Sequence, residues 1–407
     1  MKKSRVGALA SVAMLAFAAC SGGGGAGASK GEIEIWSSLP RQGSSKAQTD
    51  TLVNAINMAI EEKGGVVGGY KIVYKDVDDS TAAAGKWDEA TEIKNANDAV
   101  ANDKLVAYIG TFNSGAAKLS IPILCGKGIV MISPANTGVG LTKPFDEGEP
   151  DKYYPNGCKK NYTRVIPNDL LQGNAGAKWA SQLGAKTVYI LDDTEVYGKG
   201  IANVFNDKTA EYGLTVAGRD GIDGKATDYK ALAEKIKATN PDLVYYGGIT
   251  QNNAGQLWRD LRDAMPDVKI MGPDGVYESE FIEAAAAAAE GSYITFGGLP
   301  PDKLTGKGAE FITKYNAKYP NAKAEGYTAY GYEAVNVVLA AIERAAAKNP
   351  ADVAALRALV LDEVKATKDY DGVLGKWSFD ADGDTSLTVM SGLIIKGGEF
   401  VTETVIE

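Results

Sequence analysis

From Gly31 onward, short apolar segments alternate with amphipathic segments, and this alternation limits the possible folds more than any other feature. Ile33 and Ile35 begin the first strand, and the helical spacing of Leu52 and Ile56 predicts a helix directly after it. Repeated strand–helix units build mostly parallel sheets that helices cover on both faces. The sequence therefore predicts the α/β fold class.

The alternation runs in two series, and an irregular segment lies between them. The first series predicts strands at 33–35, 70–76, 105–110 and 128–133 and a helix at 86–102. Residues 142–161 interrupt the pattern with prolines, glycines and charges, which is typical of a surface excursion. The second series predicts strands at 187–191, 214–217, 242–246, 268–271 and 292–296, with helices at 200–212, 229–238, 253–264 and 283–290. Helices at 307–319, 326–348 and 351–368 and strands at 375–379, 388–395 and 400–405 follow. A chain of 407 residues favours two or more domains over one.

Charge and residue inventory exclude several classes of function. The 43 basic and 52 acidic residues give a formal net charge of -9, which opposes binding to nucleic acid or to an anionic membrane surface. The chain contains no histidine, so Ser-His-Asp systems and His-bearing metal sites are excluded. We expect no catalytic residue, no cofactor and no metal.

Two sequence patterns have both a functional and a plain structural interpretation. The GGVVGG run at 64–69 follows a helix and precedes a strand, the reverse of a phosphate-binding loop, so it is interpreted as a connector. The DADGD run at 380–384 resembles the start of an EF-hand loop, but Ser391 occupies the twelfth position, where glutamate is required. A hairpin turn is the better interpretation of this run.

The N-terminus has the pattern of an export signal. Lys2, Lys3 and Arg5 precede an apolar stretch at 6–19 that is too short to span a bilayer comfortably. Small residues and then Cys20 end this stretch, which resembles the lipobox of bacterial lipoproteins. This resemblance implies a signal peptide at 1–19, an acylated Cys20 and a glycine-rich tether at 20–30. Ordinary signal-peptide cleavage with an incidental cysteine is the alternative.

Besides Cys20, the chain has two cysteines. Cys125 and Cys158 form a candidate disulfide in an oxidising compartment. Two buried free thiols are the alternative.

The most informative polar positions lie directly after apolar strands, where open α/β sheets bind ligands. They are 111–114, 134–137 and 272–275. Each segment alone is equally consistent with a loop cap.

These segments belong to a set of strings whose order resembles the periplasmic binding proteins for branched-chain amino acids of ABC transporters. The strings are IGTFNS at 109–114, GIVMISPANT at 128–137, DLVYYGG at 242–248, GQL at 255–257 and MGPDG at 271–275. The resemblance covers nearly all of residues 32–407. It implies the type I periplasmic binding protein fold, in which two doubly wound Rossmann-like lobes are joined by three crossovers. We place the crossovers near Asn168, Leu299 and Gly372, which gives an N-terminal lobe of 31–168 plus 299–371 and a C-terminal lobe of 169–298 plus 372–407.

The resemblance also implies which residues bind the ligand. Ser114 matches a serine whose hydroxyl donates to an α-carboxylate, and Thr137 matches a threonine that contacts carboxylate and ammonium. Ala135 matches a carbonyl that receives the ammonium. Asp274 matches an acidic residue opposite the ammonium, and Tyr197 matches a tyrosine of the second lobe.

Two positions depart from the pattern of that family. Ile249 replaces a ligand-facing tyrosine, and Ser45 lies about where an aromatic residue shields the side chain of leucine-type ligands. The pattern for recognising the zwitterion is kept, whereas the selectivity for a side chain is in doubt.

The expected function is therefore capture of an amino acid, branched-chain or similar, for delivery to ABC permease subunits. The expected protein is an extracytoplasmic monomer that contacts the membrane only through the lipid at Cys20. A sensory receptor of the same fold and a binder of a small amide such as urea remain alternatives. An enzyme on the same scaffold would require a catalytic group that the sequence does not offer.

Overall fold

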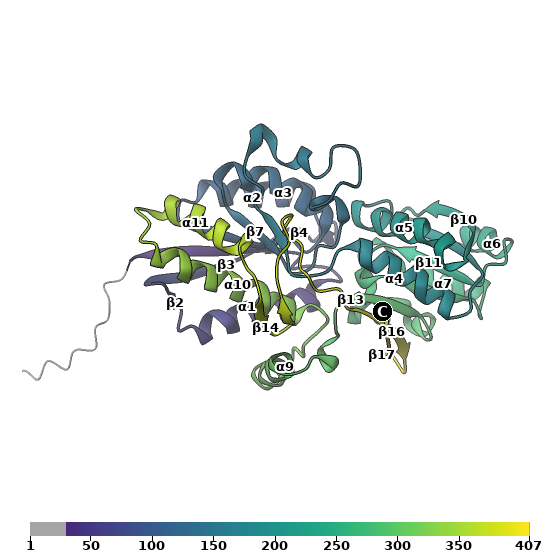
Figure 1. Cartoon of the computed structure of the whole chain (residues 1–407). Helices are drawn as coiled ribbons and strands as arrows, with labels where there is room; N and C mark the ends of the chain where they lie inside the picture. Colours follow the sequence, from purple (N-terminus) through teal and green to yellow (C-terminus); the bar gives the residue numbers. More distant parts are fainter. Residues whose placement is uncertain (1–29, 407) are drawn as a thin grey trace, which may run out of the picture.

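The computed structural model describes residues 30–406 and shows two α/β lobes side by side (Figure 1). The predicted signal peptide at 1–19, Cys20 and all but the last residue of the predicted tether lie outside the described residues. The strands of the first lobe are β1 (Glu32–Leu39), β2 (Val66–Val67), β3 (Tyr70–Asp78), β6 (Leu105–Gly110), β7 (Val130–Ser133) and β8 (Tyr162–Arg164). They form one sheet in the order β2-β3-β1-β6-β7-β8, in which only β2 pairs antiparallel.

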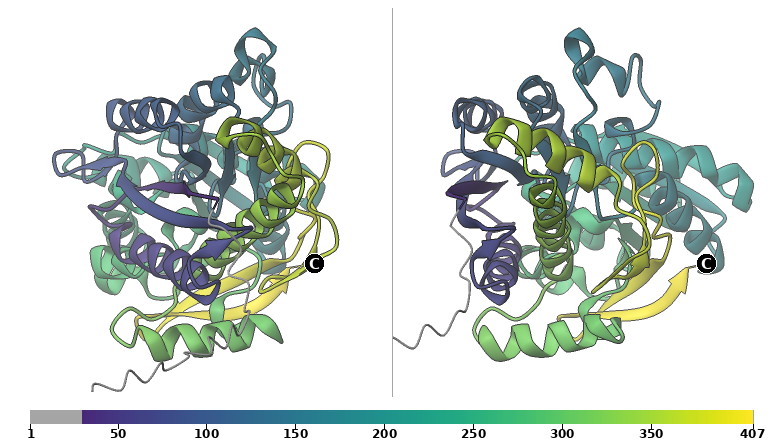
Figure 2. Two further views of the ribbon diagram at one scale, coloured as in Figure 1. Left: turned by 90° about the vertical axis from the view of Figure 1, so that its left-hand side faces the viewer. Right: turned by 60° about the vertical axis from the view of Figure 1, so that its left-hand side comes forward.

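Helices cover both faces of this first sheet, as the apolar pattern predicts. One face carries α1 (Lys46–Glu62), α10 (Thr328–Ala347) and α11 (Val353–Lys365), and the other carries α2 (Glu89–Ala101) and α3 (Ser114–Lys127). The two-stranded pairs β4 (Ser80–Thr81) with β5 (Lys86–Trp87) and β14 (Tyr370–Gly372) with β15 (Gly375–Trp377) are separate from the main sheets. The helix α9 (Lys307–Lys318), in green, lies at the edge of the molecule (Figure 2).

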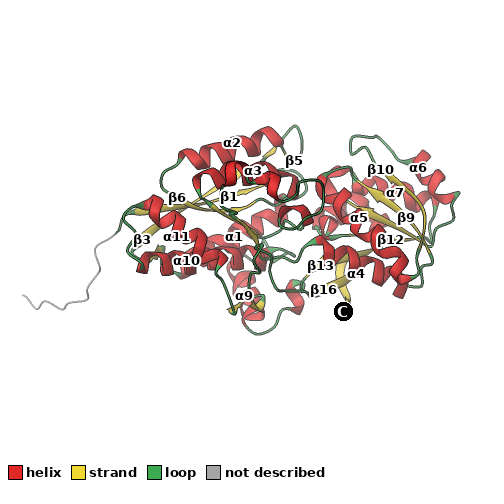
Figure 3. Cartoon of the chain, turned by 45° about the horizontal axis from the view of Figure 1, so that its top comes forward, coloured by secondary structure: helices red, strands yellow, loops and turns green. Residues whose placement is uncertain are grey.

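The second lobe repeats this layered arrangement (Figure 3). Its sheet has the order β10-β9-β11-β12-β13-β16-β17. The strands are β9 (Thr187–Asp192), β10 (Thr215–Gly221), β11 (Leu243–Gly247), β12 (Lys269–Gly272), β13 (Tyr293–Gly297), β16 (Met390–Lys396) and β17 (Glu399–Ile406), of which β16 and β17 pair antiparallel. The helices are α4 (Asp169–Gln182) and α5 (Val196–Thr209) on one face and α6 (Lys230–Lys237), α7 (Ala254–Ala264) and α8 (Ser279–Ala285) on the other.

The chain passes between the lobes three times. The first passage follows β8 and the second follows β13, close to the expected Asn168 and Leu299. The third lies between β15 and β16, at 378–389, later than the expected Gly372. The reason is that the β14–β15 hairpin stays with the first lobe, where Glu333 of α10 accepts hydrogen bonds from Val373 N at 3.0 Å and Trp377 Nε1 at 2.7 Å.

The excursion at 142–161 packs against α3. Cys125 and Cys158 form a disulfide with a Cα–Cα distance of 5.7 Å. Lys118 Nζ lies 2.6 Å from Glu149 Oε1, and the Tyr153 hydroxyl donates to the same carboxylate. These bonds attach a segment with little regular structure to the first lobe.

Two local sequence patterns have structural roles. GGVVGG forms the connection from α1 to β3, including β2. The DADGD turn pairs with Lys143 of the excursion, whose Nζ lies 2.6 Å from Asp380 and 2.5 Å from Asp382. Within residues 30–406 we find no group of three or more metal-ligating side chains that could hold a metal ion. None of the described helices is both long enough and apolar enough to cross a membrane.

Candidate functional site

The loops after the carboxyl ends of β6 and β7 in the first lobe and of β11 and β12 in the second lobe face one cleft between the lobes. A small pocket with a volume of about 30 Å³ lies there. Its lining comprises Phe112, Asn113, Ser114, Ala135, Thr137, Tyr197, Ile249, Asp274, Gly275 and Tyr327. The structure thus brings all five residues expected to bind a ligand to one pocket. Their roles toward a ligand stay a prediction.

The first lobe contributes a cluster of hydroxyl and backbone groups. Ser114 begins α3, directly after β6, and its Oγ accepts a hydrogen bond from Gly138 N at 3.1 Å. Behind it, Ser133 Oγ accepts from Ala135 N at 3.1 Å and donates to Thr111 O at 2.8 Å. These bonds fix the loop after β7 beside the N-terminus of α3. Because unpaired amides and the helix dipole meet at a helix N-terminus, this end of the pocket favours an anionic group.

The second lobe contributes a buried carboxylate. Asp274 follows β12 and is 4% exposed. It accepts hydrogen bonds from Gln172 Nε2 at 2.6 Å and from the hydroxyls of Tyr197 and Tyr327. Tyr327 precedes α10 of the first lobe, so its bond to Asp274 crosses the cleft. The carboxylate is therefore held by neutral donors from both lobes.

The charges of the residues that line the pocket would favour a ligand with a positive group. Burial raises the pKa of Asp274, and the donors Tyr197, Tyr327 and Gln172 oppose that rise. No lysine or arginine is among the described residues that line the pocket. A buried carboxylate without a cation is costly, so a ligand ammonium would supply the missing charge. The pocket therefore has hydroxyl and amide groups at one end and a buried carboxylate at the other.

The two departures from the family pattern have different positions. Ile249 lines the pocket and adds an apolar wall to Phe112. Ser45 does not line it. Its Oγ instead donates to Glu278 Oε1 of the second lobe at 2.7 Å. Burial raises the pKa of Glu278 to about 8, while the Ser45 hydroxyl opposes the rise.

Further contacts join the lobes around the pocket. Gln48 Nε2 donates to Tyr277 O at 3.1 Å, and Trp87 Nε1 donates to Glu195 Oε2 at 3.2 Å. Lys86 also pairs with Glu195. These bonds hold the lobes closed over the pocket.

Tyr327 is the pocket residue that the sequence reasoning missed. It packs edge to face on Phe112, with ring centroids 5.4 Å apart. Its position at the start of a long apolar helix has the pattern of an ordinary core residue. No local signal distinguishes it, because its contact with Asp274 joins residues 53 positions apart.

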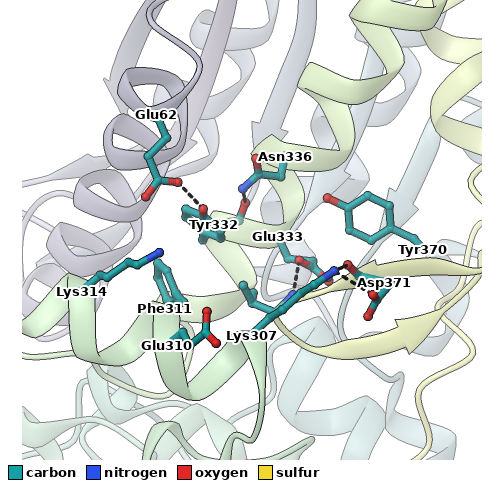
Figure 4. A pocket seen from close by; sticks show the side chains of 12 residues that line it. Glu62, Lys307, Glu310, Phe311, Lys314, Tyr332, Glu333, Asn336, Tyr370 and Asp371 are labelled. Atoms are coloured by element: carbon teal, nitrogen blue, oxygen red, sulfur yellow. Dashed lines mark hydrogen bonds and ion pairs between the residues drawn. The ribbon is translucent and has the colours of Figure 1, made fainter.

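A second pocket on the outer side of the first lobe is lined by charged and aromatic residues of α9, α10 and β14 (Figure 4). Several of its polar groups already have partners. Lys307 Nζ lies 2.7 Å from Asp371 Oδ2, the Tyr332 hydroxyl bonds Glu62, and Glu333 accepts from the β14–β15 hairpin. This paired arrangement lacks the complementary ends of the pocket in the cleft.

Comparison with known proteins identifies the family of this chain. A family model described as periplasmic binding protein matches residues 32–392. The leucine-, isoleucine-, valine-, threonine- and alanine-binding protein of Pseudomonas aeruginosa is 30% identical over 342 residues, 80% of this chain and 84% of the relative.

Two solved structures are similar along nearly the whole chain. The leucine-binding protein LivK of Thermotoga maritima has a TM-score of 0.79 and 27% identity, covering 92% of this chain and 99% of its own. The branched-chain amino acid transporter substrate-binding protein LivJ of Streptococcus pneumoniae, in complex with isoleucine, has a TM-score of 0.76 and 25% identity, covering 92% and 98%.

Proposed function

Because this chain belongs to the periplasmic binding protein family and has its type I fold, we propose that it captures an amino acid between its lobes and delivers it to an ABC permease. The observation that carries the proposal is the pocket with an anion-binding end at Ser114 and a buried, cation-free carboxylate at Asp274. A zwitterion matches both ends.

The proposed binding mode assigns a role to each lining group. The ligand carboxylate accepts from the Ser114 hydroxyl and the first amides of α3, and the ammonium donates to Ala135 O, Thr137 and Asp274. Phe112, Ile249 and Tyr327 surround the ligand's side chain. Apolar walls favour an aliphatic side chain, as in the relatives that are named for leucine, isoleucine and valine.

Closure couples binding to delivery. Ser114, Ala135 and Thr137 belong to the first lobe, and Tyr197 and Asp274 belong to the second, so neither lobe holds a whole site. The ligand adds contacts across the cleft and so favours the closed arrangement, which a permease can distinguish from an open one.

We propose that the protein works outside the cytoplasm as a monomer, attached to the membrane by a lipid on Cys20. The supporting observations are the signal-like stretch at 6–19 and the glycine-rich tether. Replacing Cys20 with serine should move the protein from the membrane fraction to the soluble fraction. Equal membrane association of the two forms would refute the anchor.

Binding without catalysis is part of the proposal. The absence of histidine from the whole sequence and the binding-protein family both support it. Ligand recovered unchanged after long incubation with the protein is the expected result.

Calorimetric titration tests the ligand class. Residues 31–407 should be titrated with leucine, isoleucine, valine, alanine, glutamate and urea, with Tyr332→Phe in the outer pocket as a control of unchanged affinity. Tight binding of an aliphatic amino acid and none of urea is expected. Binding of urea, with no amino acid bound at millimolar concentration, would refute the amino-acid proposal. A strain lacking this protein should also lose uptake of the ligand, whereas unchanged uptake would favour a sensory receptor.

A further inference from the structure

A second carboxylate, Asp169, lies buried beneath the cleft and has no role in the binding mode above. It begins α4, and its backbone N donates to Thr137 O at 2.8 Å. The side chain is fully buried, and neither carboxylate oxygen has a hydrogen-bond partner within normal distance among residues 30–406. One helical turn later, Gln172 donates to Asp274. The first turn of α4 therefore brings one carboxylate to Thr137 and one amide to Asp274.

Most titratable groups around Asp169 are negative or neutral. The titratable groups facing it from the packed elements are Asp274 after β12, Arg164 of β8, and the phenols of Tyr197, Tyr245 and Tyr327. Arg164 is already engaged, with its Nε 2.7 Å from Asp384 Oδ1 and its Nη1 2.7 Å from Gly138 O.

This environment favours the neutral form of Asp169. Burial raises the pKa of its carboxyl well above the ordinary value, and the charge of Asp274 raises it further. The Thr137 hydroxyl and Arg164 lower it. In the closed cleft without ligand, the protonated form of the Asp169 carboxyl is therefore more favoured than it is for an exposed aspartate.

We propose that Asp169 is a positioning residue that releases this proton when the ligand ammonium enters the cleft. The carboxyl O–H bond breaks, the proton passes to solvent water, and the resulting carboxylate accepts the hydrogen of the Thr137 hydroxyl. The lone pairs of Thr137 then face the ammonium. The inference rests on the proposed function, because it needs a ligand that brings a positive charge.

A purely structural role for Asp169 makes a different prediction. An acidic side chain in the first turn of a helix stabilises that helix through the dipole. Such a role affects unfolding but links no proton to ligand binding.

Calorimetry in buffers of different ionisation enthalpy measures the protons released per ligand. Leucine should be titrated into the unsubstituted protein and into Asp169→Asn at several pH values between about 5.5 and 8. Histidine is absent from the chain, and Asp274 and the buried acids Glu92, Asp193, Glu278 and Glu325 are common to both proteins. A difference in proton release between the two proteins therefore depends on the Asp169 carboxyl.

The expected difference is about one proton per ligand at the lower end of the range, because each bound ligand displaces the proton of one carboxyl. The affinity of the unsubstituted protein should then rise with pH, by up to about tenfold per pH unit. Asp169→Asn should bind roughly tenfold more weakly at pH 8, with a flatter pH profile, since an interaction with a charged group is lost.

Each outcome is decisive. Equal proton release by the two proteins overturns the inference while the proposed function stands. If Asp169→Asn does not fold, a pH-independent affinity of the unsubstituted protein overturns the inference by itself. If neither leucine nor another amino acid binds, the proposed function fails, and the inference fails with it.

Discussion

Replacing Asp274 with asparagine should change affinity and stability in opposite directions. The carboxylate is 4% exposed and is held by Gln172 Nε2 at 2.6 Å and by the hydroxyls of Tyr197 and Tyr327. Asparagine keeps the shape and can still accept from Gln172. It removes the charge that would face an ammonium inside a closed, water-excluded cleft.

The magnitude follows from the cost of an unpaired buried charge. Enclosing the ammonium without a carboxylate costs roughly 3 to 5 kcal/mol, which corresponds to about two to four orders of magnitude in the dissociation constant. The ligand-free protein responds the other way. Because burial raises the pKa of Asp274, the folded state holds this proton more tightly than the unfolded chain does, and stability falls as the pH rises above the ordinary value. Asparagine lacks this titration, so the Tm of the ligand-free variant should rise at pH 7.

Calorimetric titration with leucine and thermal unfolding without ligand measure the two effects. Asp371→Asn is a matched control, because Asp371 pairs with Lys307 at 2.7 Å on the exposed outer side of the first lobe. Its affinity for leucine should equal that of the unsubstituted protein. An Asp274→Asn variant that binds leucine within about threefold of the unsubstituted protein would refute the reasoning.

Three further changes test other parts of the molecule. Ser114→Ala should weaken amino-acid binding by about 1.5 to 3 kcal/mol, the loss of one hydrogen bond to a charged group, and an unchanged calorimetric affinity would contradict this. Replacing Cys125 and Cys158 with serine should lower the free energy of unfolding in urea by about 3 to 4 kcal/mol, since the disulfide closes a loop over a separation of 33 residues; intact-mass analysis that finds two alkylatable thiols without reductant would instead show free cysteines. Burial opposes ionisation of Glu149, but the bonds from Lys118 and Tyr153 outweigh it and lower its pKa to about 2. The unsubstituted protein should therefore have a higher free energy of unfolding than Glu149→Gln. This difference should be complete above about pH 4.5 and vanish as the pH falls toward 2. Acid unfolding of the two proteins would check this.

The sequence predicts the strands of this fold better than its helix boundaries. The apolar run at 105–110 corresponds to β6 residue for residue, because a strand buried on both faces needs unbroken apolar character. The expected helix at 283–290 is instead α8 followed by a 3-10 turn, with Ala286 at φ 53°. Packing of Ala285 and Ala289 into the core outweighs the helix propensity of the alanines.

Helix starts depend on caps that a periodic pattern does not resolve. The helix expected from residue 86 begins at Glu89, because Asp88 accepts from Thr91 N at 2.9 Å while Lys86 and Trp87 pair with β4. The helix at 114–127 was not predicted separately, because its apolar residues follow a strand and include Pro122.

The residues of the candidate site that lie in short, recognisable sequence strings could be predicted. Ser114, Ala135, Thr137 and Asp274 follow strands directly, and the structure gathers them at one pocket. Contacts between distant segments leave no local signal. The bond of Ser45 to Glu278 joins residues 233 positions apart, so the sequence alone does not reveal it.

The order in which the chain is made matters for the second lobe. Its sheet receives its last two strands, β16 and β17, from the C-terminal end, after the chain has returned to the first lobe and formed α9, α10, α11 and the β14–β15 hairpin there. During synthesis or export that begins at the N-terminus, β13 has no neighbour on that side until residue 390 and those after it emerge. A chain that stops before this point therefore leaves an apolar sheet edge open to pairing with other chains.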